Sequence, residues 1–305
     1  MTDAPDTVPD TEHRGLMRIL PGFARPYALL ARFDRPIGWW LLFWPGAWAI
    51  ALSGRAVARW DLILWFLLGS IAMRGAGCVY NDIVDRDLDR KIARTAARPL
   101  ASGAVSVKAA WVWLVALCLI GLVVLFQLNL TAAGVALASL ALVAAYPFMK
   151  RITWWPQVWL GLVFSWAAPV AWAQTGGDFD WLPGLLLYAG SVAWVIGYDT
   201  IYALQDVEDD ALVGVRSSAR ALGTRVKPGV VGFYAVAVLL WGTSFWTMRA
   251  DVLALAALLP TAWHLAWQVA TLRPADGANA LDRFRSNRFA GLLMFAACFV
   301  VGASL

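Results

Sequence analysis

Long apolar runs separated by short polar stretches are the main pattern along this 305-residue chain. About 20 nearly uncharged residues in a row let a helix cross the roughly 30 Å hydrocarbon core of a bilayer. Such windows occur nine times, at about 37–53, 61–79, 109–126, 130–147, 156–173, 181–198, 229–247, 252–270 and 288–304. The pattern predicts an all-α integral membrane protein, a bundle of nine transmembrane helices.

The residues before the first apolar run have a different character. MTDAPDTVPDTEHRG is acidic and contains proline, and no apolar segment follows until after Arg35, so we expect no secretory signal. We expect 1–24 to be a disordered cytoplasmic tail and 25–305 to form a single transmembrane domain.

Composition and charge agree with a membrane protein and indicate its orientation. Only 15% of the residues are charged, whereas a soluble domain carries about 25%. All but three of the 25 Lys and Arg residues lie on one predicted side, the exceptions being Arg55, Arg59 and Arg249. The positive-inside rule makes that side, with the N-terminus, cytoplasmic. The net charge of +5 therefore reflects topology, and nothing indicates a nucleic-acid or protein partner.

Acidic residues gather at the cytoplasmic ends of the second and sixth predicted spans. NDIVDRDLD, residues 81–89, holds four aspartates, and residues 199–210 hold five acids. DRDLDRKIARTAARPLASG (85–103) and DVEDDALVGVRSSARALG (206–223) are similar to each other in sequence. We expect an internal duplication, with related halves at about 25–150 and 151–305, as in many membrane proteins.

Helical spacing gives the acidic segments a common geometry. Asn81, Asp85 and Asp89 are four residues apart, so on a helix continuing from the second span they share one face. Asp199, Asp206 and Asp210 are seven and four apart and would do the same. Like charges at this spacing repel, so a chain normally avoids the arrangement.

Three interpretations of the acids compete. A solvated acidic helix surface would mix acids and bases evenly over its faces. An ion-coupled transporter would keep its site near the bilayer midplane, where these spans carry almost no ionisable residue. A divalent cation site between two carboxylate-rich segments fits best, because Mg²⁺ prefers hard oxygen ligands and substrate phosphates. Cations for a diphosphate are on the same side: Lys91, Arg94, Arg98, Lys150, Arg151, Arg216 and Arg220.

The two acidic segments and several shorter motifs resemble those of a known family. NDIVDRDLD and YDTIYALQDVEDD are similar to the two aspartate motifs of the UbiA-type intramembrane aromatic prenyltransferases. DRPIG (34–38), MRGAGCVYND (73–82), RTAARPLASG (94–103), YPFMKR (146–151) and GVRSSARALG (214–223) are most similar to the members that use 4-hydroxybenzoate. The resemblance extends from about residue 25 to the C-terminus.

The resemblance implies a fold and a reaction. The nine helices would surround a central cavity, with cytoplasmic helical caps carrying the aspartate motifs. The enzyme would use Mg²⁺, as two ions, to transfer a polyprenyl group from polyprenyl diphosphate to 4-hydroxybenzoate in ubiquinone biosynthesis. We expect it in a bacterial inner membrane, with the active site facing the cytoplasm. The alternative within the family is a sister enzyme with a haem, naphthoate or homogentisate acceptor.

Roles for individual residues follow. The expected metal ligands are Asn81, Asp82, Asp85, Asp89, Asp199, Asp206 and Asp210, whereas Asp87 would face solvent. Asp85, Asp206 and Asp199 are the expected catalytic acids, Asp199 being one candidate for the base that removes the ring proton. The diphosphate would meet Lys91, Arg94, Arg98, Lys150 and Arg151. The acceptor would meet Arg35, Arg32 or Arg74 at its carboxylate, beside Tyr146 and Tyr202.

Overall fold

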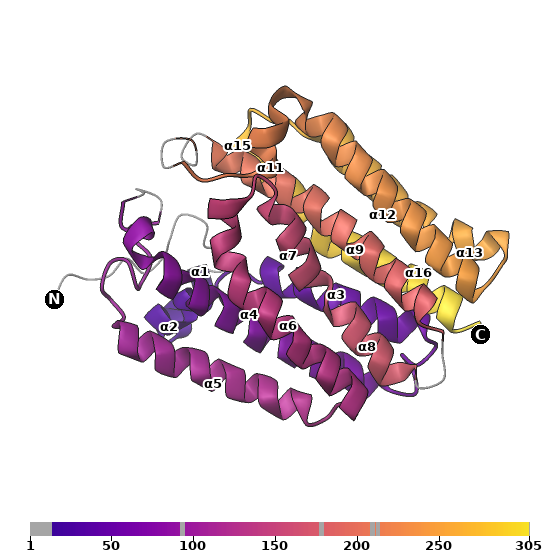
Figure 1. Cartoon of the computed structure of the whole chain (residues 1–305), viewed down its shortest axis with the longest axis horizontal. Helices are drawn as coiled ribbons and strands as arrows, with labels where there is room; N and C mark the ends of the chain where they lie inside the picture. The colour runs from indigo at the N-terminus through magenta and orange to yellow at the C-terminus, as the bar shows by residue number, and fades with distance from the viewer. Residues whose placement is uncertain (1–13, 92–94, 177–179, 208–210, 212–213, 305) are drawn as a thin grey trace. The chain divides into compact units, whose positions relative to one another are not determined.

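Every regular element of the described chain is helical, as the sequence predicts. The computed structural model describes residues 14–304 except 92–94, 177–179, 208–210 and 212–213 (Figure 1). The α-helices are α1 (Arg14–Ile19), α2 (Arg25–Leu30), α3 (Ile37–Leu52), α4 (Trp60–Asp89), α5 (Val107–Leu125), α6 (Leu130–Ile152), α7 (Pro156–Ser165), α8 (Ala167–Thr175), α9 (Trp181–Tyr202), α11 (Ser218–Leu222), α12 (Val226–Met248), α13 (Val252–Ala256), α14 (Leu259–Thr271), α15 (Gly277–Arg285) and α16 (Asn287–Gly302). Short 3₁₀ turns, η1 (Ala203–Gln205) and η2 (Gly223–Arg225), follow α9 and α11.

Seven helical segments in the described chain are long and apolar enough to cross a bilayer. They are Trp60–Asp89, Val107–Leu125, Leu130–Ile152, Trp181–Gln205, Ser218–Met248, Val252–Thr271 and Gly277–Gly302. The two other predicted spans coincide with α3, which has 16 residues, and with the consecutive helices α7 and α8. Pro169 has no N–H for the carbonyl of Ser165, where α7 ends, which accounts for the break between these two helices. The chain is thus an all-helical integral membrane protein.

Two compact units can be distinguished. The first contains Met1–Trp40 and Leu67–Gln127, and the second contains Leu41–Phe66 and Leu128–Leu305. The prediction of a disordered tail falls partly on residues 1–13, outside the described residues. Within the rest of that segment α1 forms a helical turn, and its Met17 is 1% exposed against Ala28 and Leu29.

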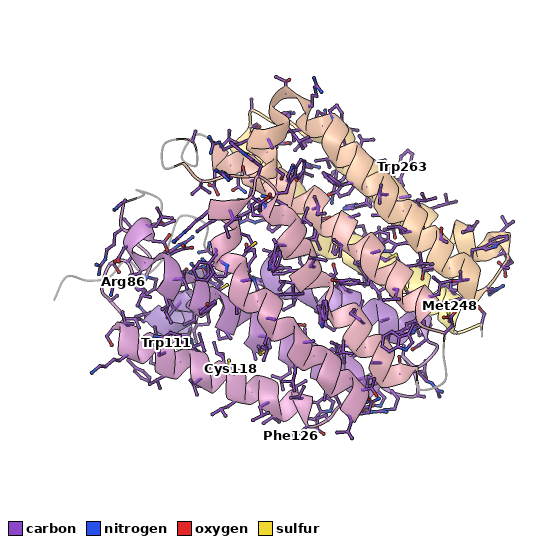
Figure 2. All side chains as sticks on the ribbon, viewed as in Figure 1. Arg86, Trp111, Cys118, Phe126, Met248 and Trp263 are labelled. Carbon is purple, nitrogen blue, oxygen red and sulfur yellow. The ribbon has the colours of Figure 1, made fainter. Side chains whose placement is uncertain are left out.

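Small residues allow α4 and α5 of the first unit to pack closely. A Cβ at Gly121 would lie 2.5 Å from the sulfur of Met73, and one at Gly75 would lie 3.2 Å from a methyl of Leu117. Such close approaches stabilise helix pairs in lipid, where burial of apolar surface gives little driving force. The opposite side of α5 remains exposed, with Trp111 at 45% and Phe126, just after its end, at 74% (Figure 2).

Buried tryptophans hold the second unit together, in which α9 and α12 run side by side (Figure 1). The indole rings of Trp48 on α3, Trp194 on α9 and Trp241 on α12 lie 5.0–6.3 Å apart by centroid, all at 0% exposure. Trp48 Nε1 donates to the carbonyl of Gly291 at 2.8 Å, and Trp194 Nε1 donates to Asn287 Oδ1 at 2.9 Å. Buried indole N–H groups usually find such a partner, although Trp241 Nε1 has none among the described residues.

Two further indoles join α6 to the helices that follow it. Trp159 Nε1 donates to the carbonyl of Leu142 at 2.7 Å, and Trp166 Nε1 donates to that of Val135 at 2.8 Å. These bonds connect segments that are only 17 and 31 residues apart. The pair formed by α6 and α7/α8 therefore has its own cross-links.

Candidate active site

The first acidic motif lies on one buried face at the end of α4. Asp82, Asp85 and Asp89 are 2%, 1% and 5% exposed. They are spaced i, i+3 and i+7, which places them on the same side of a helix. The side chain of Asp87, by contrast, is 75% exposed and pairs with Arg86 at 3.1 Å. α4 continues to Asp89, so the predicted helical face is present and Asp87 lies outside it.

Two arginines, Arg32 and Arg98, bond to two of these carboxylates. Arg32 Nη2 donates to both oxygens of Asp82, at 2.9 and 3.0 Å. Arg98 Nη1 contacts Asp82 Oδ1 at 3.4 Å and Asp89 Oδ2 at 2.9 Å. Buried carboxylates are stable only when paired and hydrogen-bonded in this way. The predicted acceptor-binding Arg32 and the predicted diphosphate-binding Arg98 thus both contact the acids in this structure.

Arg32 also has an unusual backbone. Its φ of 58° makes it the only non-glycine residue of positive φ in the described chain, a conformation that strains an L residue and is found preferentially at functional sites. Its Nη1 donates to the carbonyl of Leu29 at 2.9 Å. Burial alone would lower the pKa of Arg32, but the neighbouring Asp82 raises it above its ordinary value. The guanidinium therefore stays charged, and the pair holds the turn between α2 and α3 against α4.

The second acidic motif departs from its predicted geometry. α9 ends at Tyr202, η1 follows, and Asp206 has φ −115° and ψ 4°, outside the α-helical region. The expectation that Asp199 and Asp206 share the face of one continuing helix is therefore wrong. Further along the chain, Ser218 hydrogen-bonds Thr200 near the end of α9. Asp210 lies outside the described residues.

The predicted diphosphate-binding cations occupy separate helix ends. Lys150 and Arg151 lie in the last turn of α6, where positive charge also interacts favourably with the helix dipole. Lys91 is exposed just after α4, and Arg94 lies outside the described residues.

The remaining acceptor candidates have structured surroundings. Arg35 pairs with Asp34 at 3.2 Å, and Asp34 is completely buried. Arg74 lies against the backbone of Gly38, where an added Cβ would be 2.7 Å from its Nε. Asp34 and Gly38 had no predicted role, although both belong to the motif DRPIG.

Two tyrosines complete the predicted set. Tyr146 on α6 is half-buried. Tyr202 at the end of α9 packs its ring on Phe284, with centroids 4.5 Å apart. Tyr198, one turn earlier and 1% exposed, contacts the same Phe284 at 5.8 Å. A cluster of three aromatic rings, Tyr198, Tyr202 and Phe284, therefore lies beside the second acidic motif.

The buried carboxylates are suited to Mg²⁺ rather than to a metal held by protein alone. Within the described part of the chain, no three His, Cys, Asp or Glu side chains form a metal cage. Mg²⁺ usually binds through one or two carboxylates together with water and substrate phosphates. Asp85 and Asp89, which are buried on one face with Arg98 bonded to Asp89, fit that mode of binding.

Comparison with known proteins identifies the family. The UbiA prenyltransferase family matches residues 42–301, most of the chain. The chain belongs to this family. The resemblance noted from the aspartate motifs is thereby confirmed.

Relatives of this UbiA-family chain share one name. The mitochondrial 4-hydroxybenzoate polyprenyltransferase of Drosophila melanogaster is 43% identical over 274 residues, which cover 89% of this chain and 70% of that protein. The enzyme of the same name from Rattus norvegicus is 41% identical, over 89% of this chain and 73% of that protein.

Solved structures share the UbiA fold. The apo structure of a UbiA homolog from Aeropyrum pernix K1 matches with a TM-score of 0.71 and 28% identity, over 86% of this chain and 97% of that one. A UbiA homolog from Archaeoglobus fulgidus bound to GPP and Mg²⁺ matches with a TM-score of 0.67 over 92% of this chain and all of that one. At 18% identity the second match shows a common fold.

Proposed function

We propose that this chain is a Mg²⁺-dependent 4-hydroxybenzoate polyprenyltransferase of ubiquinone biosynthesis. It transfers a polyprenyl group from polyprenyl diphosphate to the ring carbon ortho to the acceptor hydroxyl. The observation that carries the proposal is that relatives 39–43% identical over about nine-tenths of the chain bear this name. The buried acids of α4 supply the polar surface that the donor diphosphate requires.

The first acidic motif is proposed to bind a Mg²⁺ ion that contacts the diphosphate. Asn81, Asp85 and Asp89 are the proposed ligands, and Mg²⁺ bound there supplies positive charge that stabilises the departing diphosphate. Asp82 bonds to Arg32 and Arg98, so its proposed role is to hold the end of α4, with Asp85 and Asp89, in place.

The second acidic motif is proposed to hold a second ion. Asp199, Asp206 and Asp210 are its ligands, and the sequence similarity between the two motifs supports equivalent roles. Replacing Asp206 with Ala in purified protein should abolish transfer at saturating Mg²⁺. Near-normal transfer by that variant would exclude the second ion site.

Diphosphate binding and carbon–oxygen cleavage are assigned to cations and aromatic rings. Lys91, Arg94, Arg98, Lys150 and Arg151 contact the diphosphate. The allylic cation that remains is stabilised by ring faces in a dry environment, with Tyr146, Tyr198 and Tyr202 as candidates. Asp199 is the candidate base for the ring proton.

The acceptor carboxylate is assigned to an arginine beside DRPIG. Arg32 bonds to Asp82 and Arg35 pairs with Asp34, and both remain candidates for this contact together with Arg74. Gly38 leaves room for the Arg74 side chain, which supports its placement near the acceptor.

The proposed topology has nine spans, with α3 and α7/α8 added to the seven long segments. Positive charges on one side support a cytoplasmic N-terminus and active site. The membrane is proposed to be a bacterial inner membrane, although the relatives named above are mitochondrial. Residues 25–305 form one domain of two related halves in this proposal.

A transfer assay tests the function. Purified protein is incubated with labelled 4-hydroxybenzoate, a polyprenyl diphosphate and Mg²⁺. Prenylated 4-hydroxybenzoate is the expected product, and EDTA should abolish it. Product with a naphthoate or homogentisate acceptor, and none with 4-hydroxybenzoate, would assign the chain to a sister activity.

A further inference from the structure

The segment that follows the second acidic motif, residues 214–222, is fastened to the end of α6. The backbone N–H of Arg216 donates to the carbonyl of Lys150 at 3.3 Å. Its side-chain Nη1 donates to the carbonyl of Ile152 at 2.7 Å. Both acceptors belong to the last turn of α6, whose carbonyls have no partner within the helix. Arg216 thus caps the helix end that carries Lys150 and Arg151.

An exposed tryptophan reinforces this attachment. The guanidinium carbons of Arg216 and Arg220 lie 5.7 and 5.3 Å from the ring centroid of Trp154. Distances below about 6 Å give a favourable cation–π interaction, and Trp is the strongest partner. Trp154 is 44% exposed, so close packing in a core does not explain its position. The ring of Trp154 therefore makes cation–π contacts with two arginines of residues 214–222.

A buried polar bridge ties the same segment to α7 and α9. The N–H of Ser218 donates to Gln157 Oε1 at 3.0 Å, and the hydroxyls of Ser218 and Thr200 are 2.7 Å apart. Thr200 Oγ1 donates to the carbonyl of Ile196 at 2.7 Å. A hydroxyl has one hydrogen to donate, so Ser218 is the donor to Thr200. Gln157, Thr200 and Ser218 are 5%, 0% and 0% exposed.

These contacts connect the two parts of the proposed site that lie in the second unit. Thr200 directly follows Asp199, and η1 leads from there to Asp206. Lys150 and Arg151 lie on α6 at the other end of the attachment. Residues 214–222 therefore add a further connection between α6 and α9, both of which also pack on α7.

We propose that Trp154 and Ser218 are positioning residues that fix the distance between the cations of α6 and the carboxylates of Asp199 and Asp206. Trp154 acts on the diphosphate site through Arg216 and Arg220, and Ser218 acts through Thr200. The proposal rests on the proposed function, because it assumes that both sets of charges meet one Mg²⁺–diphosphate.

Binding of Mg²⁺ and inorganic pyrophosphate to the purified full-length protein tests the proposal, by titration calorimetry. Trp154→Ala should raise the Kd about tenfold, equivalent to the loss of two cation–π contacts. Trp154→Phe should recover part of the loss because it keeps a ring face. Trp111→Ala is the control, since Trp111 is 45% exposed on α5, and it should leave the Kd unchanged.

Steady-state kinetics separate positioning from a structural role. In Trp154→Ala and Ser218→Ala, the KM for polyprenyl diphosphate should rise while the KM for 4-hydroxybenzoate stays constant. Equal pyrophosphate affinity in Trp154→Ala and wild type overturns the proposal. A lower melting temperature with unchanged KM values for both substrates also overturns it. If the wild-type protein binds pyrophosphate tightly but transfers no prenyl group, the proposed function is rejected. The positioning role is then decided by the pyrophosphate Kd of Trp154→Ala compared with that of the wild type.

Discussion

Replacing Arg32 tests the anchoring of the first acidic motif. Arg32→Ala leaves Asp82, which is 2% exposed, without its two-bond partner. Breaking a buried ion pair by removing one member destabilises a protein by about 3–5 kcal/mol. Because Arg98 still contacts Asp82 at 3.4 Å, we expect the lower end of this range, about 3 kcal/mol.

The backbone of Arg32 provides a second, separable effect. At its φ of 58°, glycine avoids the strain that an L residue carries, about 1–2 kcal/mol. Arg32→Gly should therefore be more stable than Arg32→Ala, although both lose the ion pair. The pKa of Arg32 is raised, so its contribution is complete at every pH below the ordinary arginine value, and the loss should be the same from pH 6 to pH 9.

Thermal unfolding in detergent measures these differences. With an unfolding entropy of about 2.1 cal/mol/K per residue, a loss of about 3 kcal/mol corresponds to a fall in Tm of about 5 °C for a 305-residue chain. Arg59→Ala is the control, because Arg59 and Asp61 form an exposed pair, and it should leave the Tm unchanged. If Arg32→Ala kept the wild-type Tm and changed only the KM for 4-hydroxybenzoate, the anchoring role would be refuted and direct acceptor binding favoured.

Other replacements test the faces and contacts of α4. Asp85→Ala should lower transfer by about 100-fold or more even at saturating Mg²⁺; near-normal transfer would contradict the metal assignment. Asp87→Ala, at an exposed position, should change stability by no more than about 0.5 kcal/mol and leave transfer intact, and a large loss in either would mean that the wrong face was chosen. Gly38→Ala should displace Arg74 and raise the KM for 4-hydroxybenzoate. Gly77→Ala, whose Cβ would meet no atom within 4 Å, should leave that KM unchanged. Equal effects of the two substitutions would contradict the assignment of Arg74 to the acceptor.

Local periodicity predicted what depends on local structure. The spacing of Asn81, Asp85 and Asp89 predicted a shared face on a continuing helix, and in the structure Asp85 and Asp89 are buried together with Asp82. Asp87 lies outside this face and is exposed, as predicted. The apolar windows identified the long spans because length and hydropathy are properties of each segment alone.

Contacts between distant residues were beyond the reach of that reasoning. Arg32 and Asp82 are 50 residues apart, and nothing in the sequence pairs them. The helical extrapolation from Asp199 to Asp206 was wrong because α9 ends at Tyr202. The contact between Thr200 and Ser218, 18 residues apart, was likewise not visible in the sequence. Spacing describes a helix only while the helix continues.

The tryptophan N–H bonds have a consequence for how the protein is made. Chains are synthesised from the N-terminus at about 5–20 residues per second. α6 and α7/α8 can complete their indole bonds as soon as they leave the insertion machinery, because the partners are close in sequence. Trp48 must wait for Gly291, 243 residues later, a delay of about 10–50 s at that rate. The first apolar helix of the second unit therefore finds its permanent hydrogen-bond partner only when the last helix enters the membrane.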